Sequence, residues 1–181
     1  MRINVAAIPE TMMEAELFGA TRGAFTDARR DRQGYLAAAD GGTLLLDEIA
    51  EMRPELQTKL LRAIETRRYY PVGASREAVT DVRIIAATNR DPEQAIAEGR
   101  LRADLFYRLS AMLIRVPALR DRRDDIPLLA RHLLGVTRRQ LRRGPGGFSA
   151  EALDALRECP WPAASLTLPP HCERVSSSSL R

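Results

Sequence analysis

Two segments of the chain are apolar at almost every position, without the alternation that marks a strand with one solvated face. The first is residues 43–46, which follow Gly41-Gly42 and end in Asp47-Glu48, and the second is residues 82–87. Such runs are typical of strands buried on both faces of a parallel sheet. The pattern therefore predicts two central parallel strands. Two further strands are expected, at residues 2–7 and 113–116.

Other segments place apolar residues three and four positions apart, which is the spacing of one face of an α-helix. Asp91 before Pro92 and Ser149 are typical helix starts, and Thr11 with Glu14 has the spacing of a capping box. Helices are expected at residues 11–18, 55–66, 101–112, 125–143 and 149–156, and after Asp91. Strands alternating with helices predict an α/β fold with a mainly parallel sheet, and the helices after residue 125 predict a small appended subdomain.

Glycine and proline mark the irregular segments. Residues 19–34 contain three glycines and many charges and are expected to form a loop. Residues 68–79 are expected to form a hairpin around Gly73. Residues 163–181 contain four consecutive serines and no hydrophobic period, so this tail is expected to be disordered.

The composition is that of one ordinary soluble domain. The chain has 181 residues, 45% of them hydrophobic, and 28 basic residues are interspersed with 24 acidic ones for a net charge of +4. Such a mixed surface gives little support to a DNA-binding domain. No apolar run reaches the roughly 18 residues of a membrane span, and no signal segment begins the chain. A cytoplasmic protein without membrane partners is expected.

The acidic pair at the end of the first apolar run is a candidate for phosphoryl-transfer chemistry. Ligands of parallel sheets bind outside the carboxyl ends of the strands. There, Asp47 could hold Mg²⁺ and Glu48 could polarise an attacking water. An Asp-Glu pair alone is weak support, because many strands end in solvated acids. The preceding Gly-Gly-Thr-Leu-Leu-Leu makes the interpretation stronger.

Three other polar residues suit the same chemistry. Asn89 follows the second strand and could orient the water or the terminal phosphate, although on spacing alone a turn asparagine is the simpler interpretation. Arg102 and Arg108 lie six residues apart, on different faces if helical, and could reach a neighbouring subunit's nucleotide. In a chain so rich in arginine, they could equally be surface residues.

Five segments resemble the central domain of sigma-54-dependent transcription activators, in that family's order and spacing. The resemblance covers about residues 2–162. The segments are ELFGATRGAFTDA (residues 16–28), GGTLLLDEI (41–49), VRIIAATNRD (82–91), LRADLFYRL (101–109) and VPALRDRRDDIPLLA (116–130).

The resemblance implies an AAA+ ATPase that assembles into a ring, usually a hexamer, and remodels the sigma-54 RNA polymerase complex using ATP and Mg²⁺. It implies a P-loop NTPase-like parallel sheet with helices on both faces, followed by a helical lid subdomain. Asp47 and Glu48 match its Walker B magnesium ligand and catalytic base. Asn4 matches the asparagine that holds this glutamate when inactive. Asn89 matches the first sensor, and the paired trans-acting arginines match Arg102 and Arg108.

The resemblance also implies a contact with sigma-54 itself. The family's GAFTGA loop matches Gly23, Ala24, Phe25, Thr26, Asp27 and Ala28. Asp27 replaces the second glycine of this motif and adds a charge where glycine permits a positive φ. Weakened engagement of sigma-54 is therefore expected.

Two further departures concern the ends of the match. No G-x-x-x-x-G-K-[ST] phosphate-binding loop occurs in the chain, so very weak binding of ATP is expected. After Trp161-Pro162 the family pattern is expected to end, with a frameshift as the leading explanation. The expected organisation is a partial AAA+ core without Walker A (residues 1–120), a partial helical lid (121–162) and an aberrant tail (163–181).

Two functions remain open. The first is a fragment of an ATP-driven activator that is inactive alone and carries no DNA-binding domain. The second is a non-enzymatic module that docks on sigma-54 or poisons rings by co-assembly through Arg102 and Arg108.

Overall fold

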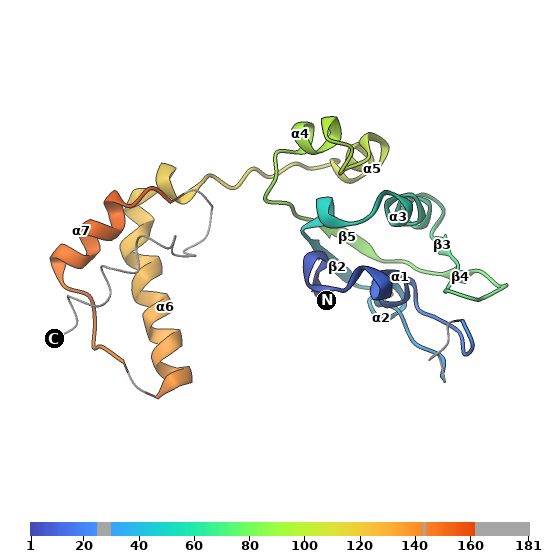
Figure 1. Cartoon of the computed structure of the whole chain (residues 1–181), viewed down its shortest axis with the longest axis horizontal. Coiled ribbons are helices and arrows are strands. Elements are labelled where there is room, and N and C mark those ends of the chain that lie inside the picture. The colour runs from blue at the N-terminus through green and yellow to red at the C-terminus, as the bar shows by residue number, and fades with distance from the viewer. Residues whose placement is uncertain (25–29, 143, 162–181) are drawn as a thin grey trace. The chain divides into compact units, whose positions relative to one another are not determined.

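Strand β2 (Thr43–Asp47) lies at the centre of a three-stranded parallel sheet (Figure 1). Its neighbours are β1 (Arg2–Asn4) and β5 (Arg83–Ala86), with Ile3 opposite Leu46 and Leu44 opposite Ile84. The expected α/β fold with a parallel sheet is confirmed, and both apolar runs form strands of it.

The computed structural model describes residues 1–24, 30–142 and 144–161 and divides into two units, Met1–Leu113 and Ile114–Arg181. The sheet belongs to the first unit. The helices of that unit are η1 (Val5–Ala7), α1 (Glu10–Phe18), α2 (Tyr35–Ala38), η2 (Ile49–Glu51), α3 (Pro54–Thr66), α4 (Pro92–Ala97) and α5 (Ala103–Leu109).

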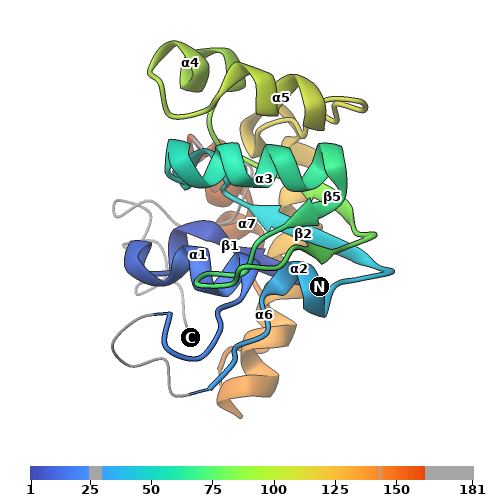
Figure 2. The same ribbon diagram turned by 90° about the vertical axis from the view of Figure 1, so that its right-hand side faces the viewer.

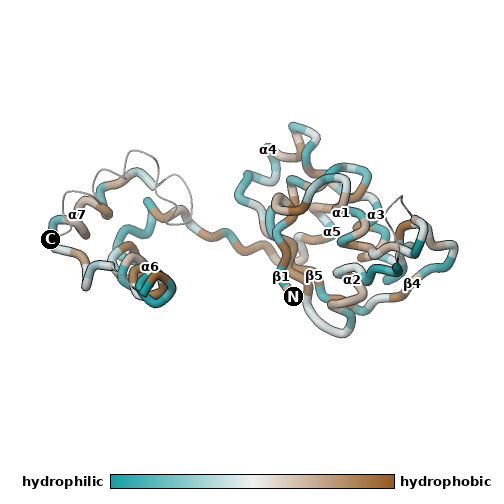
Figure 3. Tube along the Cα trace, turned by 60° about the horizontal axis from the view of Figure 1, so that its bottom comes forward, coloured by the Kyte–Doolittle hydropathy of each residue, from teal (hydrophilic) through white to brown (hydrophobic). Residues whose placement is uncertain are grey.

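One face of the sheet is buried against helices. Ile3, Leu44 and Leu46 are almost fully buried in a single core with residues of α1 and α3, such as Leu17 and Leu60. Figures 1 and 2 show α3 lying along the sheet, and Figure 3 shows the hydrophobic positions on β1 and β5.

The opposite face of the sheet is more open. It carries Leu45, which is half-buried, and Ile85, which is 44% exposed. Side chains alternate between the faces of a strand, so the helices that bury Leu44 and Leu46 leave Leu45 uncovered.

The first strand is shorter than predicted. It ends at Asn4, because the Asn4 side-chain oxygen accepts a hydrogen bond from the Ala6 N–H (2.9 Å) and starts the 3₁₀ turn η1. The expected strand over residues 2–7 is therefore only half correct. The capping box is also wrong, since α1 begins after Pro9 and Thr11 lies within the helix.

The other local signals fare better. Asp91 caps α4 by accepting hydrogen bonds from the N–H groups of Glu93 and Gln94, both at 3.0 Å. The expected hairpin is formed by β3 (Arg68–Tyr69) and β4 (Ala78–Val79), which pair antiparallel. Helix α5 is shorter than the predicted 101–112, and α2 was not predicted at all.

The second unit is a small helical assembly. It consists of η3 (Leu119–Asp121), η4 (Arg123–Asp125), α6 (Ile126–Leu141) and α7 (Ala150–Glu158). Ser149 caps α7 as predicted, accepting from the Ala152 N–H (3.2 Å). Trp161 is buried beside Leu119 and Ile126 and donates its Nε1–H to the Leu156 carbonyl (2.8 Å).

Residues 113–116 are not a strand, and Leu113, Ile114 and Val116 are 54%, 75% and 63% exposed. A strand needs a partner for its backbone hydrogen bonds, and no described strand pairs with this segment. The tail expected to be disordered, residues 163–181, lies outside the described residues.

Candidate functional site

Glu48 and Asn89 meet at the carboxyl ends of β2 and β5. The pairing of the two chains continues beyond the strands, because the Ala87 N–H donates to the Leu46 carbonyl (2.8 Å) and the Ile49 N–H donates to the Ala87 carbonyl (2.9 Å). This brings the Asn89 backbone N–H to 3.3 Å from the Glu48 carboxylate oxygen Oε2. Two residues that are 41 positions apart in sequence thus share one corner of the sheet.

The backbone of Glu48 has a left-handed conformation, with φ 59° and ψ 49°. For a residue with a Cβ this costs about 1–2 kcal/mol. Such strain persists only where the surroundings impose it, and it gathers at functional sites. Here the chain must leave β2 and turn at once into η2 while Ile49 stays bonded to Ala87. The strained turn places the half-buried Glu48 side chain beside the end of β5.

Asp47 is the last residue of β2 and is half-buried. Its Oδ2 atom lies 2.6 Å from the Arg2 guanidinium Nη2. Asn4 lies directly opposite Asp47 in the register of β1 and β2, although among its described contacts the side chain caps η1 and does not contact Glu48. Arg2 was missed in the sequence, where one arginine among many gave no signal.

The carboxylates suit one kind of metal site. In the described part of the chain, no three His, Cys, Asp or Glu side chains gather into a metal-binding cluster. A Mg²⁺ ion that keeps waters and phosphate oxygens needs only one or two protein carboxylates. Asp47, at the strand end, is the residue placed to supply one.

Arg102 stands at the N-cap of α5 and is exposed. Its side chain forms a bidentate pair with Asp104, with Nε to Oδ1 at 3.0 Å and Nη2 to Oδ2 at 2.7 Å. These hydrogen bonds raise the pKa of Arg102 and lower the pKa of Asp104 below its ordinary value. Asp104 is a second residue that the sequence did not single out.

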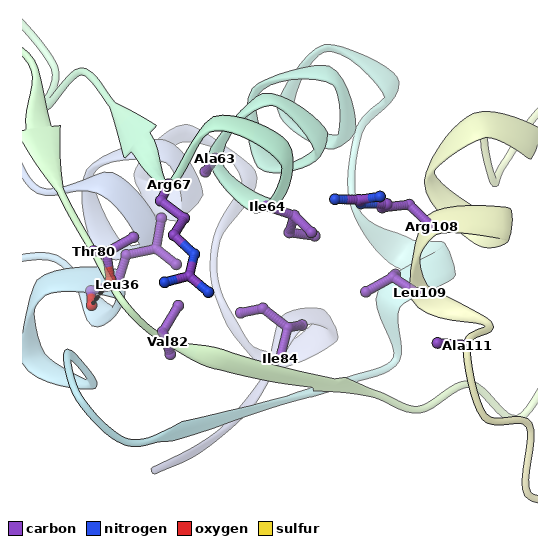
Figure 4. Close-up of a pocket in the computed structure, with 10 residues that line it drawn as sticks. All are labelled: Leu36, Ala63, Ile64, Arg67, Thr80, Val82, Ile84, Arg108, Leu109 and Ala111. Carbon is purple, nitrogen blue, oxygen red and sulfur yellow. Dashed lines mark hydrogen bonds between the residues drawn. The ribbon is translucent and has the colours of Figure 1, made fainter.

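Arg108 lies in the last turn of α5, about 9 Å along the helix axis from Arg102. It lines a cavity of about 230 Å³ whose floor is apolar, with Ile64 of α3 and Ile84 of β5 (Figure 4). Arg67 lies toward the other end of this cavity. The two predicted arginines therefore lie at opposite ends of one short helix and do not form a single cluster.

The base of the predicted sigma-54-contacting loop is tightly built. Ala20 pairs with Arg32 across the loop, with N to O at 2.9 Å, and the Thr21 N–H donates to the Val72 carbonyl of the hairpin (3.0 Å). Gly34 is needed here, because a Cβ would lie 2.5 Å from the Phe18 carbonyl carbon. Backbone hydrogen bonds thus hold the base of this loop to the hairpin of β3 and β4.

The tip of that loop is only partly described. Gly23 has φ 82° and Ala24 donates its N–H to the Thr21 carbonyl (3.1 Å). Phe25, Thr26, Asp27 and Ala28 lie outside the described residues.

Comparison with known proteins gives two family matches. Residues 1–115 match the sigma-54 interaction domain, and residues 120–164 match the AAA+ ATPase lid domain. None of the helices in the described ranges is long and apolar enough to cross a membrane.

Curated relatives are similar over most of this chain. The Nif-specific regulatory protein of Herbaspirillum seropedicae is 44% identical over 177 residues, which are 98% of this chain and 33% of that protein. The transcriptional regulatory protein GlrR of Escherichia coli is 47% identical over 88% of this chain and 36% of its own length. The chain thus spans about a third of these relatives. The first alignment extends past Pro162, where the family pattern is expected to end.

Solved structures agree with the sequence relatives. NtrX of Brucella abortus has a TM-score of 0.81 and 38% identity, over 89% of this chain and 36% of NtrX. A structure of NtrX in complex with ATP has a TM-score of 0.77 over 90% of this chain and 35% of NtrX. The chain therefore belongs to the AAA+ family of sigma-54 interaction domains found in bacterial transcription activators.

Proposed function

We propose that the chain is part of the ATPase domain of a sigma-54-dependent activator of the cytoplasm, and that it carries the groups that act on a bound nucleotide. The observation that carries this proposal is the meeting of Glu48 with Asn89 at the carboxyl ends of two parallel strands, with Asp47 beside them. The left-handed turn at Glu48 supports it, because strain of this kind is kept where geometry matters.

In this proposal each residue has a distinct task. A nucleotide with Mg²⁺ supplies the phosphoryl group and the neutralising cation. Asp47 of the Walker B strand would hold the cation in place of its ion pair with Arg2, and Glu48 would take up a proton from the attacking water. Asn89 fixes Glu48 through its backbone N–H and presents its exposed side chain as a sensor. Asn4, opposite Asp47, is the proposed switch for the glutamate.

The residues present fit only part of a nucleotide site. A phosphate cradle needs successive backbone N–H groups of a glycine-rich loop and a lysine. The single lysine of the 181 residues, Lys59, lies on α3 and is ion-paired with Glu14. We therefore propose that these 181 residues alone do not hydrolyse ATP, and that Asp47, Glu48 and Asn89 act only on a nucleotide whose phosphates are held by further residues.

The arginines give the chain a role toward a neighbour. Arg102 and Arg108 are exposed on α5, and we propose that they act as arginine fingers on a nucleotide bound by an adjacent subunit of a ring. Such arginines stabilise transition-state charge and are worth roughly 10³–10⁵ in rate. This contribution does not require a phosphate cradle on the chain that supplies them.

The experiment mixes the chain with a GlrR variant that lacks its own trans-acting arginines. The mixture is expected to hydrolyse ATP although neither protein does so alone, and an Arg102→Ala, Arg108→Ala double variant should lose the effect. Arg100→Ala is the matched control, because Arg100 is an exposed arginine nearby that pairs with Glu98 (3.2 Å). ATP hydrolysis by the chain alone that Glu48→Gln abolishes would contradict the proposal.

A second candidate is a non-enzymatic module that docks on sigma-54 through residues 23–28, which match the family's GAFTGA loop. The base of the loop favours it, because Ala20 pairs with Arg32 and the Thr21 N–H bonds to the Val72 carbonyl, so the base of this loop is held to the hairpin of β3 and β4. Purified sigma-54 should then retain the chain on a column, Phe25→Ala should release it, and Asp27→Gly should strengthen retention. If the sigma-54 column retains the chain and the chain does not assemble with GlrR, the result favours this candidate.

A further inference from the structure

Gln57 is a polar side chain in the middle of the core. It lies in the second turn of α3 and is fully buried, and in the described part of the chain only Thr80 is a comparably buried polar residue. A buried amide is costly unless its hydrogen-bonding groups are satisfied. Its partners therefore show what it holds in place.

The Gln57 amide makes three hydrogen bonds, all to backbone groups. Its Nε2 donates to the carbonyls of Met52 and Arg100, both at 2.6 Å. Its Oε1 accepts from the Arg102 N–H at 2.8 Å. Both N–H groups and the oxygen of the side chain are thus used.

These contacts join two parts of the candidate site. Met52 directly follows η2, the turn that begins after Glu48. Arg102 is the N-cap of α5, and the N–H of an N-cap residue has no acceptor within its own helix. Gln57 supplies that acceptor and holds the preceding turn through the Arg100 carbonyl. One amide therefore fixes the backbone of Arg102 relative to Met52, at the end of the turn η2 that follows Glu48.

We propose that Gln57 is a positioning residue for Arg102, which fixes the backbone from which this arginine reaches a neighbouring subunit. The proposal rests on the trans-acting role of Arg102 proposed above. It differs from a general role in stability, because α3 is also anchored by Leu56, Leu60 and Ala63, which are buried independently of the amide. Loss of the amide should therefore loosen the start of α5 more than it loosens α3.

The first measurement follows backbone geometry in the full 181-residue chain, with no need for activity. Amide hydrogen exchange by NMR compares the chain with Gln57→Leu, which has a similar volume and no polar group. The Arg102 amide is expected to exchange at least tenfold faster in this variant, while the Leu60 amide keeps its protection. Gln94→Leu is the matched control, because Gln94 is exposed and bonds Glu98 only across its own helix (2.8 Å).

The second measurement follows ATP hydrolysis in the mixture with the GlrR variant that lacks its own trans-acting arginines. Gln57→Leu is expected to lower kcat about tenfold to a hundredfold with KM for ATP unchanged, because a misplaced group loses transition-state stabilisation without weakening substrate binding. Gln94→Leu should match the unaltered chain. Where Gln57→Leu does not fold, Gln57→Asn takes its place, since it keeps a buried amide that is one methylene too short to reach all three partners.

The outcomes separate this inference from the proposed function. An inactive Arg102→Ala variant beside a fully active Gln57→Leu variant overturns the positioning role and leaves the proposed function standing. Full activity of Arg102→Ala overturns the role of that arginine and the positioning role with it. Loss of protection at both Leu60 and Arg102 overturns the inference in favour of a purely structural amide. A selective loss at Arg102 with a lower kcat supports it.

Discussion

Arg102 and Asp104 form a two-point ion pair at the start of α5, with both guanidinium contacts at 3.0 Å or less. Asp104 also accepts a hydrogen bond from the Leu105 N–H (2.8 Å), which holds the carboxylate against the helix start. The arginine proposed to reach a neighbouring subunit is thus already paired with a carboxylate of its own chain. To bind a phosphate of the neighbour it must break its hydrogen bonds to Asp104, and the free energy of this pair opposes that binding.

The pKa of Asp104 should report the pairing directly. It is lowered in the folded chain, mainly by the hydrogen bond from Arg102, so the ion pair is present above the ordinary aspartate pKa and is lost as the pH falls through the lowered value. In Arg102→Gln the pKa of Asp104 should rise toward its ordinary value, because the hydrogen bond that lowers it is lost. A ¹³C NMR titration of the carboxyl group measures it, and Arg100→Gln, which removes a neighbouring guanidinium, should leave it unchanged.

The left-handed backbone at Glu48 predicts an inverted preference between glycine and alanine. Glu48→Gly relieves the strain that Glu48→Ala keeps, so the glycine variant should be more stable to urea by about 1 kcal/mol. At Glu51, within the turn η2, the order should be reversed, because glycine is disfavoured in helical conformations. Unfolding followed by far-UV circular dichroism measures both pairs, and the same order at the two positions would contradict the assignment of strain to Glu48.

Gly34 should tolerate no side chain. A Cβ there meets backbone atoms of Phe18 and Gly19, which cannot move aside as a flexible side chain would. Gly34→Ala is expected to lower the free energy of unfolding by about 1–3 kcal/mol. Gly135→Ala provides the contrast, because a Cβ there meets nothing within 4 Å, and it should gain about 0.5–1 kcal/mol in helix α6. Urea titrations of both variants test the close approach of Gly34 to Phe18 and Gly19. An unchanged free energy of unfolding of Gly34→Ala would contradict it.

Trp161 should be required for the folding of the second unit and not for that of the first. It is 1% exposed and anchors the cluster of Leu119 and Ile126, so Trp161→Ala is expected to cost about 3–5 kcal/mol and to unfold α6 and α7. Trp161→Phe should cost less, because it keeps most of the volume and loses mainly the bond to Leu156. Amide NMR spectra show which unit unfolds in Trp161→Ala. The signals of α3 should keep their chemical shifts, while those of α6 and α7 should move to the shifts of an unfolded chain.

The parts of the fold that the sequence could predict depend on local signals. The apolar runs located β2 and β5, because a strand between neighbours needs apolar side chains at nearly every position. Asp91 and Ser149 located helix starts, because each side chain satisfies N–H groups within three residues of itself. The resemblance to activators supplied the role assignments, which stay predictions.

The parts that could not be predicted depend on partners distant in the sequence. Residues 113–116 are as apolar as a strand, yet the described chain offers them no hydrogen-bonding neighbour. Gln57 and Arg102 are 45 positions apart, and no local pattern around either residue predicts their contact. One signal was available: Gln57 lies three positions before Leu60 on the apolar stripe of α3, where a polar residue needs a buried partner.

The backbone bonds that join Leu46, Ala87 and Ile49 continue the sheet past its last strand residues. Glu48 lies between two of these bonded positions and Asn89 follows two residues after Ala87. The proposed base, Glu48, and the proposed sensor, Asn89, therefore follow directly on backbone that is hydrogen-bonded between the two strand ends. A displacement of the backbone at Ala87 would stretch hydrogen bonds on both sides of Glu48, so a movement at this end of β5 reaches the end of β2 directly.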